Sequence, residues 1–171
     1  MATLSATALK VIEAYSSWDI KQIMDVRAPE CIQEMCPSTS STIALPHHHI
    51  TQSPPLTAFS PPPHTGTLGI APMDNTAFEA WQKSIMHAFR NVEIKILEMI
   101  EDPESNKVAM WAKSSAETDI GPYTNEYMIV LHMNKEKTKI VRLREFADSA
   151  YANEFFPRLK KHFAEKQGAK N

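Results

Sequence analysis

The sequence predicts an α+β fold, in which helices lie against one face of an antiparallel sheet. Two observations lead to this prediction. Apolar residues recur at helical spacing near the N-terminus, within residues 73–89 and again after residue 148. Between residues 90 and 148, four segments alternate apolar and polar residues and are joined by short turns, a pattern typical of antiparallel hairpins.

The first helical region is expected from residue 3 to about residue 26. Within it, residues 19–26 suggest a short second helix with Asp19 as its N-cap. This helix must end before Pro29, because the residue that precedes a proline avoids the helical conformation. Residues 30–37 then predict a short strand.

A long loop is expected next, as an insertion at about residues 38–72 of a single domain that spans residues 1–171. The segment 37–72 holds eight of the twelve prolines and many Ser and Thr residues, which excludes a regular helix or a central strand. Its three consecutive histidines, 47–49, cannot easily converge on one metal ion, so no metal site is expected.

Order returns with a helix over residues 73–89, which Asp74 or Asn75 can cap. The last helix is expected over residues 149–167. The four strand candidates between these helices cover residues 91–100, 107–118, 123–133 and 139–147.

Composition narrows the function classes. The net charge is −2 and 43% of the residues are hydrophobic, which allows a real core without a basic surface for nucleic acid. No apolar run approaches the roughly 20 residues that span a bilayer, and the first residues lack the pattern of a secretory signal. Cys31 and Cys36 fit no zinc pattern and are expected to be thiols in a reducing compartment. A cytoplasmic protein is the expectation.

The fourth strand carries a carboxylate in an unusual place. Strand alternation puts Glu145 on the same face as Leu143, Val141 and Ala147. The other face carries Ile140, Arg142, Arg144 and Phe146 and is expected to face solvent. A carboxylate in a largely dry pocket has a raised pKa, which suits a group that gives and takes protons near neutral pH. The alternative is an exposed Glu145 that pairs with a neighbouring arginine.

The third strand places Tyr123, Asn125 and Tyr127 on one face, which continues as an apolar interior. A wall with two phenols and an amide at one end and apolar residues at the other suits a ligand pocket. The alternative is that both tyrosines are core residues whose hydroxyls have found partners.

Four segments carry a family resemblance: AYSSWDIKQIMDVRAPEC (14–31), PMDNTAFEAW (72–81), NKVAMWAKSSAETDIGPYTNEYMIVLHM (106–133) and KIVRLREFADSAYANEFFPRL (139–159). They resemble the fungal SnoaL-like proteins of the nuclear-transport-factor-2-like (NTF2-like) superfamily, and the similarity covers most of the chain except residues 38 to about 68. The resemblance implies a cone-shaped α+β barrel, with a curved antiparallel sheet around the N-terminal and central helices.

The resemblance also implies an activity. Characterised members of this subgroup rearrange natural-product scaffolds without a redox cofactor, as isomerases and cyclases of meroterpenoids, dihydroanthracenone isomerases and semipinacolase-type isomerases. In the last of these, an arginine, two tyrosines four residues apart and a glutamate are proposed to act. The matching positions of this sequence are Arg27, Tyr123, Tyr127 and Glu145.

Two of the candidate catalytic residues keep more than one interpretation. Arg27 can hold a carbonyl or enolate oxygen, can form an ion pair with Glu145, or can lie on the surface. Asp74 is expected chiefly as an N-cap, and the resemblance keeps it as a further acid–base candidate.

Five residues are candidates for binding the substrate: Trp18, Met110, Trp111, Asn125 and Leu143. For Trp18, Met110 and Trp111, packing in the core is the alternative.

Taken together, these features predict a cofactor-independent isomerase or cyclase of fungal secondary metabolism that acts by acid–base catalysis on a polycyclic carbonyl compound. The alternatives are a lactone-forming or ring-opening hydrolase and a non-catalytic ligand-binding module of the same fold. The resemblance further implies a homodimer through the sheet face that carries Arg142, Arg144 and Phe146.

Overall fold

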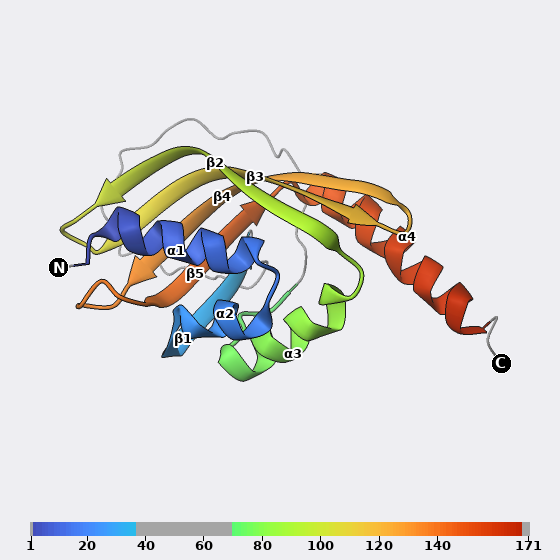
Figure 1. Ribbon diagram of the computed structural model, residues 1–171, viewed down its shortest axis with the longest axis horizontal. Helices are drawn as coiled ribbons and strands as arrows, with labels where there is room; N and C mark the ends of the chain where they lie inside the picture. The colour runs from blue at the N-terminus through green and yellow to red at the C-terminus, as the bar shows by residue number, and fades with distance from the viewer. Residues whose placement is uncertain (1, 37–69, 169–171) are drawn as a thin grey trace, which may run out of the picture.

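The computed structural model describes residues 2–36 and 70–168, and it confirms the predicted α+β fold (Figure 1). The three histidines and residues 38–69 of the predicted loop lie outside the described residues. The elements, in chain order, are α1 (Leu4–Ser16), α2 (Ile20–Asp25), β1 (Arg27–Cys36), α3 (Asn75–Met86), β2 (Arg90–Asp102), β3 (Lys107–Thr118), β4 (Gly121–Met133), β5 (Ile140–Ala147) and α4 (Ser149–Gly168).

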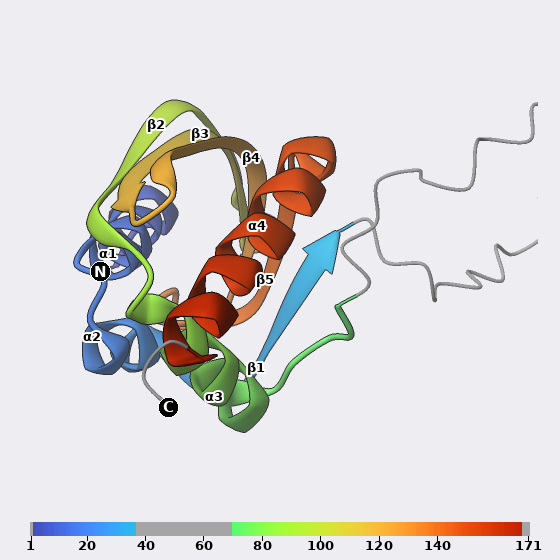
Figure 2. The ribbon, with the colours of Figure 1, turned by 90° about the vertical axis from the view of Figure 1, so that its right-hand side faces the viewer.

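A single curved sheet organises these elements, with the strand order β1-β5-β4-β3-β2. The strands β2 to β5 form the antiparallel series that the short turns predict. The sheet curls over α1, while α4 lies across one end of the curved sheet (Figure 2). No helix in the described part of the chain is both long enough and apolar enough to cross a membrane.

Strand β1 differs from its prediction in length and direction. It begins at Arg27, three residues earlier than expected, and pairs with β5 in parallel at the edge of the sheet. The ladder is irregular between Arg27 and Ile32, so the missing N–H of Pro29 interrupts no regular pairing there. The parallel partner comes from far along the chain, which is why local sequence pattern does not reveal it.

Strand β5 contains one correction to the predicted faces. Ile140 was expected beside the arginines, yet it is fully buried in the core. The register with β4 shifts here, because Arg142 pairs with His132 whereas Ile140 pairs with Met133. The extra residue, Val141, breaks the period-two alternation and turns Ile140 inward.

The helices begin where side-chain caps are available. Asp19 accepts a hydrogen bond from the backbone N–H of Gln22 at 3.0 Å, which confirms it as the N-cap of α2. Asp74 caps α3 in the same way, through the N–H of Ala77 at 2.8 Å. Each cap satisfies one of the backbone donors that the first turn of a helix leaves without an intrahelical partner.

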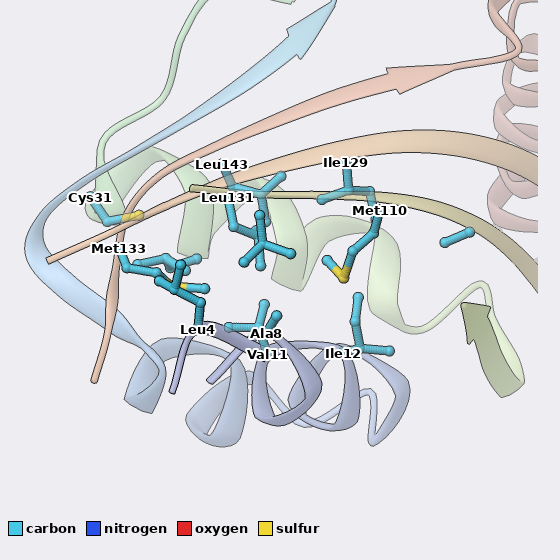
Figure 3. Packing of buried hydrophobic residues seen from close by; sticks show 13 residues of the cluster. Leu4, Ala8, Val11, Ile12, Cys31, Met110, Ile129, Leu131, Met133 and Leu143 are labelled. Atoms are coloured by element: carbon cyan, nitrogen blue, oxygen red, sulfur yellow. The ribbon is translucent and has the colours of Figure 1, made fainter. Parts of the chain in front are cut away.

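The main hydrophobic core joins α1 to the concave face of the sheet (Figure 3). Ala8 and Val11 of α1 are almost fully buried, and so are Met110 of β3 and Leu131 of β4. The core occupies one end of the curved sheet. A second, aromatic cluster around Phe89, Tyr123 and Phe155 forms where β4 meets α4.

Candidate active site

A cavity of about 620 Å³ lies between the concave face of the sheet and the helices α1, α3 and α4. Its walls are mostly apolar side chains of both helices and strands. The polar side chains that the mechanism can use come from α1, β1, β3, β4 and β5: Tyr15, Gln33, Ser114, Tyr123, Asn125, Tyr127 and Glu145. A mainly apolar cavity with a few grouped polar side chains is the usual form of a small-molecule site.

Glu145 lies on β5 between β4 and β1, with Ile129 and Met35 as its neighbours in the two ladders. The side chain is partly buried, and it lines the cavity. Burial raises the pKa of the Glu145 carboxyl to about 7, because desolvation disfavours the anion. Among the described residues, none forms an ion pair with this carboxylate. Near neutral pH the group is therefore able both to take and to give a proton.

The two predicted tyrosines meet through their hydroxyls, which lie 2.8 Å apart. The side-chain amide of Asn125 donates to the Tyr123 oxygen at 3.2 Å, and the hydroxyl of Ser114 donates to the Tyr127 oxygen at 3.2 Å. Strand pairing explains this grouping, since Ser114 of β3 lies directly opposite Asn125 of β4.

The backbone sets the direction of this network through Asn125. Its side-chain oxygen accepts from the N–H groups of Glu126 at 2.8 Å and Asp148 at 3.1 Å, so its nitrogen must donate to Tyr123. Either tyrosine can donate across the 2.8 Å contact, and the hydroxyl that accepts there keeps its own proton for a ligand in the cavity. Burial raises the pKa of both phenols, which therefore act as donors and not as bases.

Arg27 lies behind the cavity wall and is 2% exposed, which excludes a position on the surface. Its Nε donates to the side-chain oxygen of Asn75 at 2.8 Å, and Nη1 donates to the Tyr15 hydroxyl at 2.9 Å and to Gln33 Oε1 at 3.1 Å. Its guanidinium lies 4.1 Å from the centre of the Phe78 ring. These contacts leave no ion pair between Arg27 and Glu145 in the described structure.

The remaining candidates divide into two groups. Trp18, Asn125 and Leu143 line the cavity, and the Trp18 indole N–H is held by the carbonyl of Met86 at 3.0 Å. Met110 and Trp111 do not line it. Met110 is wholly buried in the core beneath α1, whereas Trp111, the next residue along the strand, lies 43% exposed on the opposite face.

Asp74 also lies away from the cavity lining. It is exposed, and its carboxylate is occupied as the N-cap of α3. The structure thus gives it the capping role that the sequence pattern favours. Its neighbour Asn75 has a separate function, because its side-chain nitrogen donates to the carbonyls of Ala28 and Pro29 while its oxygen holds Arg27.

Sequence reasoning missed seven polar residues that line the cavity: Tyr15, Gln33, Gln82, Ser114, Ser115, Asn153 and Lys160. A weak signal existed for Ser114, a small polar residue at an inward position of an otherwise apolar face of its strand. Tyr15 lies within the apolar stripe of α1, where a tyrosine has the pattern of a core residue. No cluster of three or more His, Cys, Asp or Glu side chains suited to a metal ion is found within residues 2–36 and 70–168.

The fold and the cavity define an NTF2-like protein with a small-molecule site. No family model matches the chain. Over 107 residues, the chain is 30% identical to "Monooxygenase dmxR10" of a Cryptosporiopsis species, a match that covers 61% of this chain and 71% of the relative. It is 26% identical over 160 residues to "Austinoid biosynthesis clusters protein F" of Penicillium brasilianum, which covers 91% of this chain and 87% of that one.

Among solved structures, the BvnE pinacolase from Penicillium brevicompactum superimposes with a TM-score of 0.70 at 25% identity, over 98% of this chain and 95% of that chain. These relatives agree with the resemblance that the sequence motifs indicate. The chain belongs to the SnoaL-like family of fungal secondary-metabolism proteins, within the NTF2-like fold.

Proposed function

We propose that this protein is an isomerase or cyclase that moves protons on a polycyclic, carbonyl-containing intermediate of secondary metabolism. One observation carries the proposal: Glu145, whose pKa burial raises to about 7, lies in an apolar cavity beside a pair of hydrogen-bonded phenols. The name "pinacolase" of the structural neighbour BvnE supports a rearrangement of the same class.

The proposed mechanism uses the ionised form of Glu145 as a base. It removes a proton from the carbon next to a substrate carbonyl, and the Tyr127 hydroxyl donates to the oxygen on which negative charge develops. Tyr123, itself held by Asn125, supports Tyr127 through their 2.8 Å contact. The protonated Glu145 then returns the proton to a different carbon or to the oxygen. Such a reaction depends on placed donors and on the exclusion of water.

The base can be tested before the natural substrate is known, with 5-nitrobenzisoxazole. A base removes the C–H proton of this compound, the N–O bond breaks, and a coloured nitrile-phenolate forms. We expect a rate that rises with pH around a midpoint near 7, following ionisation of Glu145. Glu145→Gln should lower this rate by a factor of about 100 or more, as expected for removal of a general base.

Glu126→Gln is the matched control, because Glu126 lies on the adjacent strand with an exposed side chain that forms an ion pair with Lys113 at 3.7 Å. Equal rates for the two glutamine variants would remove Glu145 from the mechanism. The natural substrate itself is best sought in extracts of a strain in which this gene is deleted, since the unconsumed intermediate should accumulate there.

A second candidate function is oxygenation, and the names of relatives such as "Monooxygenase dmxR10" favour it. The first step would be the same deprotonation by Glu145. The resulting carbanion of a CH₂ group would react with O₂, and the CH₂ group and O₂ would become a carbonyl group and water. Product formation in the absence of O₂ supports isomerisation, whereas incorporation of ¹⁸O from ¹⁸O₂ supports the second candidate.

A hydrolase and a ligand-binding module are distinguished from an isomerase by simple observations. A hydrolase would incorporate oxygen from labelled water into its product. A purely ligand-binding module would require no base, yet the cavity contains both tyrosines and a glutamate of raised pKa, an arrangement that favours an enzyme.

Homodimer formation through the outer face of the sheet is also proposed. Three exposed apolar side chains from adjacent strands, Trp111, Met128 and Phe146, lie in one cross-strand row on that face. Light scattering coupled to gel filtration should give twice the mass of the chain, and Met128→Lys should give the mass of the monomer.

A further inference from the structure

We infer that Tyr15 is a second hydrogen-bond donor of the cavity, which binds a carbonyl or hydroxyl oxygen of the substrate, and that Arg27 acts through Tyr15 as a positioning residue. This inference deepens the proposed function, since it assigns a further group to the same cavity. It assigns to a neighbouring side chain the oxygen-binding role that was one of the three interpretations of Arg27.

The position of Tyr15 meets the geometric requirement for such a donor. It projects from α1 and lines the cavity, where it is partly accessible, in contrast to the buried Arg27 behind it. The Phe78 ring contacts both residues, with its centre 6.2 Å from that of the Tyr15 ring and 4.1 Å from the Arg27 guanidinium. The phenol is therefore held in place on one side and open to the cavity on the other.

The hydroxyl proton of Tyr15 forms only a long hydrogen bond within the protein. The Tyr15 oxygen accepts from Arg27 Nη1 at 2.9 Å, whereas its own hydroxyl donates to Gln33 Oε1 over 3.4 Å. The same Gln33 oxygen already accepts from Arg27 at 3.1 Å. A substrate oxygen in the cavity offers the Tyr15 proton a shorter bond. The charged donor behind the phenol makes that proton a stronger donor, because linked hydrogen bonds polarise one another.

Arg27 is not among the side chains that line the cavity, and its Nε and Nη1 donate to Tyr15, Gln33 and Asn75. Its Nη2 is buried and has no hydrogen-bond partner among the described residues. Its positive charge can still reach the substrate oxygen through the Tyr15 hydroxyl. Burial is the main cause that raises the pKa of Tyr15, Tyr123 and Tyr127, and the negative charge of Glu145 adds to it in each case, which places the carboxylate within electrostatic reach of both donor sites.

The competing explanation is that the Tyr15 hydroxyl only ties α1 to β1. A structural tie would contribute to stability but would not contact a ligand. The two explanations differ in one measurable property, the hydrogen bond to a ligand carbonyl. We therefore suggest 9-fluorenone as the probe and fluorene, its hydrocarbon of nearly the same shape, as the matched control ligand.

The experiment begins from the double variant Tyr123→Phe/Tyr127→Phe, which removes the two phenolic donors of β4. Infrared spectra of bound 9-fluorenone should still show a carbonyl band shifted to lower wavenumber by hydrogen bonding. Adding Tyr15→Phe should abolish this shifted band. Adding Arg27→Met in its place should weaken the shift without removing it. A double variant that shows only the unshifted band would overturn the inference.

Affinity gives a second measurement in the otherwise unchanged protein, in case the multiple variants fold poorly. Tyr15→Phe should weaken binding of 9-fluorenone by about fivefold, the effect of one neutral hydrogen bond, and leave fluorene binding unchanged. Equal losses for both ligands would show a structural role only. No proton is transferred in either measurement, so their outcome is independent of whether Glu145 acts as the proposed base.

Discussion

Strand β4 passes through two regions of opposite character. At its C-terminal end, Leu131 and Met133 pack beneath α1 in the main core. At its N-terminal end, Tyr123 and Tyr127 stand at the wall of a cavity of about 620 Å³. Both ends use the same inward face and the same alternation, so the strand itself does not decide which end is filled.

The difference arises from what covers each end. At the packed end, small and branched side chains of α1 such as Leu4 and Ala8 fit closely against the sheet. At the cavity end, large rings from the α3–β2 connection, β4 and α4, namely Phe89, Tyr123 and Phe155, pack against one another around the wall. Collapse of this end would also break the hydrogen bonds that hold the phenols and Asn125. The cavity therefore stays open because packed aromatic rings and hydrogen bonds hold its wall in place.

The largest expected effect on stability is at the packed end. Leu131→Ala leaves a hole beneath α1 and should lower the free energy of unfolding by about 2–5 kcal/mol. Tyr127→Phe, four residues earlier on the same face, removes one hydroxyl from an existing cavity and should cost only about 1 kcal/mol. Urea unfolding of the two variants measures the contrast. Similar losses for both would show that the two ends do not differ in packing.

The pH dependence of stability tests the cavity end. The folded pKa of Glu145, about 7, lies above the value of an unfolded glutamate, so the folded state binds more protons between these values. Its contribution to stability is therefore fully kept at low pH and is lost as pH rises from about 4.5 through 7. The total loss, relative to Glu145→Gln, should be about 3 kcal/mol.

The measurement is the urea midpoint of both proteins between pH 5 and pH 8. The difference in unfolding free energy should grow in favour of the glutamine variant as pH rises. If the unfolding free energies of the two proteins changed with pH in parallel, Glu145 would not be desolvated in the folded protein. The cavity would then be no drier than the solvent around it.

A smaller effect separates capping from catalysis at Asp74. Asp74→Ala removes the N-cap of α3 and should cost about 1 kcal/mol of stability. The rate with 5-nitrobenzisoxazole should stay within twofold of the unchanged protein, because Asp74 is not part of the cavity lining. Asp74→Asn, which keeps a capping side chain, should restore the stability. A large loss of rate in both variants would return Asp74 to the acid–base candidates.

The smallest effect is expected at Ser114. Ser114→Ala removes one of the hydrogen bonds to the Tyr127 oxygen while the contact with Tyr123 remains. The rate with 5-nitrobenzisoxazole should fall by about two- to fivefold, and thermal stability should change little. The control is Thr124→Ala, whose exposed side chain on the adjacent strand is not part of the cavity lining. A larger loss in the control would show that the hydroxyl of Ser114 has no part in the network.

The local pattern of apolar and polar residues was sufficient to predict most of the secondary structure and part of the candidate site. Period-two alternation correctly places Tyr123, Asn125 and Tyr127 on one face, and it places Glu145 with Leu143. These positions follow from backbone geometry within a single strand, because alternate side chains of a strand must point to the same side. The family resemblance added Arg27, which alternation alone would not have selected.

Other features needed the tertiary structure, because they depend on contacts between distant segments. The parallel pairing of β1 with β5 joins residues more than 100 positions apart, and the register shift in β5 buries Ile140 against expectation. The same long-range assembly places Trp111 outside and Met110 in the core.

The sequence by itself thus determined which residues share a face, and with it the group of Glu145 and the two tyrosines. Only the tertiary structure decided which part of that face would be filled by α1 and which would remain a cavity. It also decided that Tyr15 would stand between Arg27 and the cavity. The physical reason is that alternation is a property of one strand, whereas burial, desolvation and hydrogen-bond partners are set by every element packed around it.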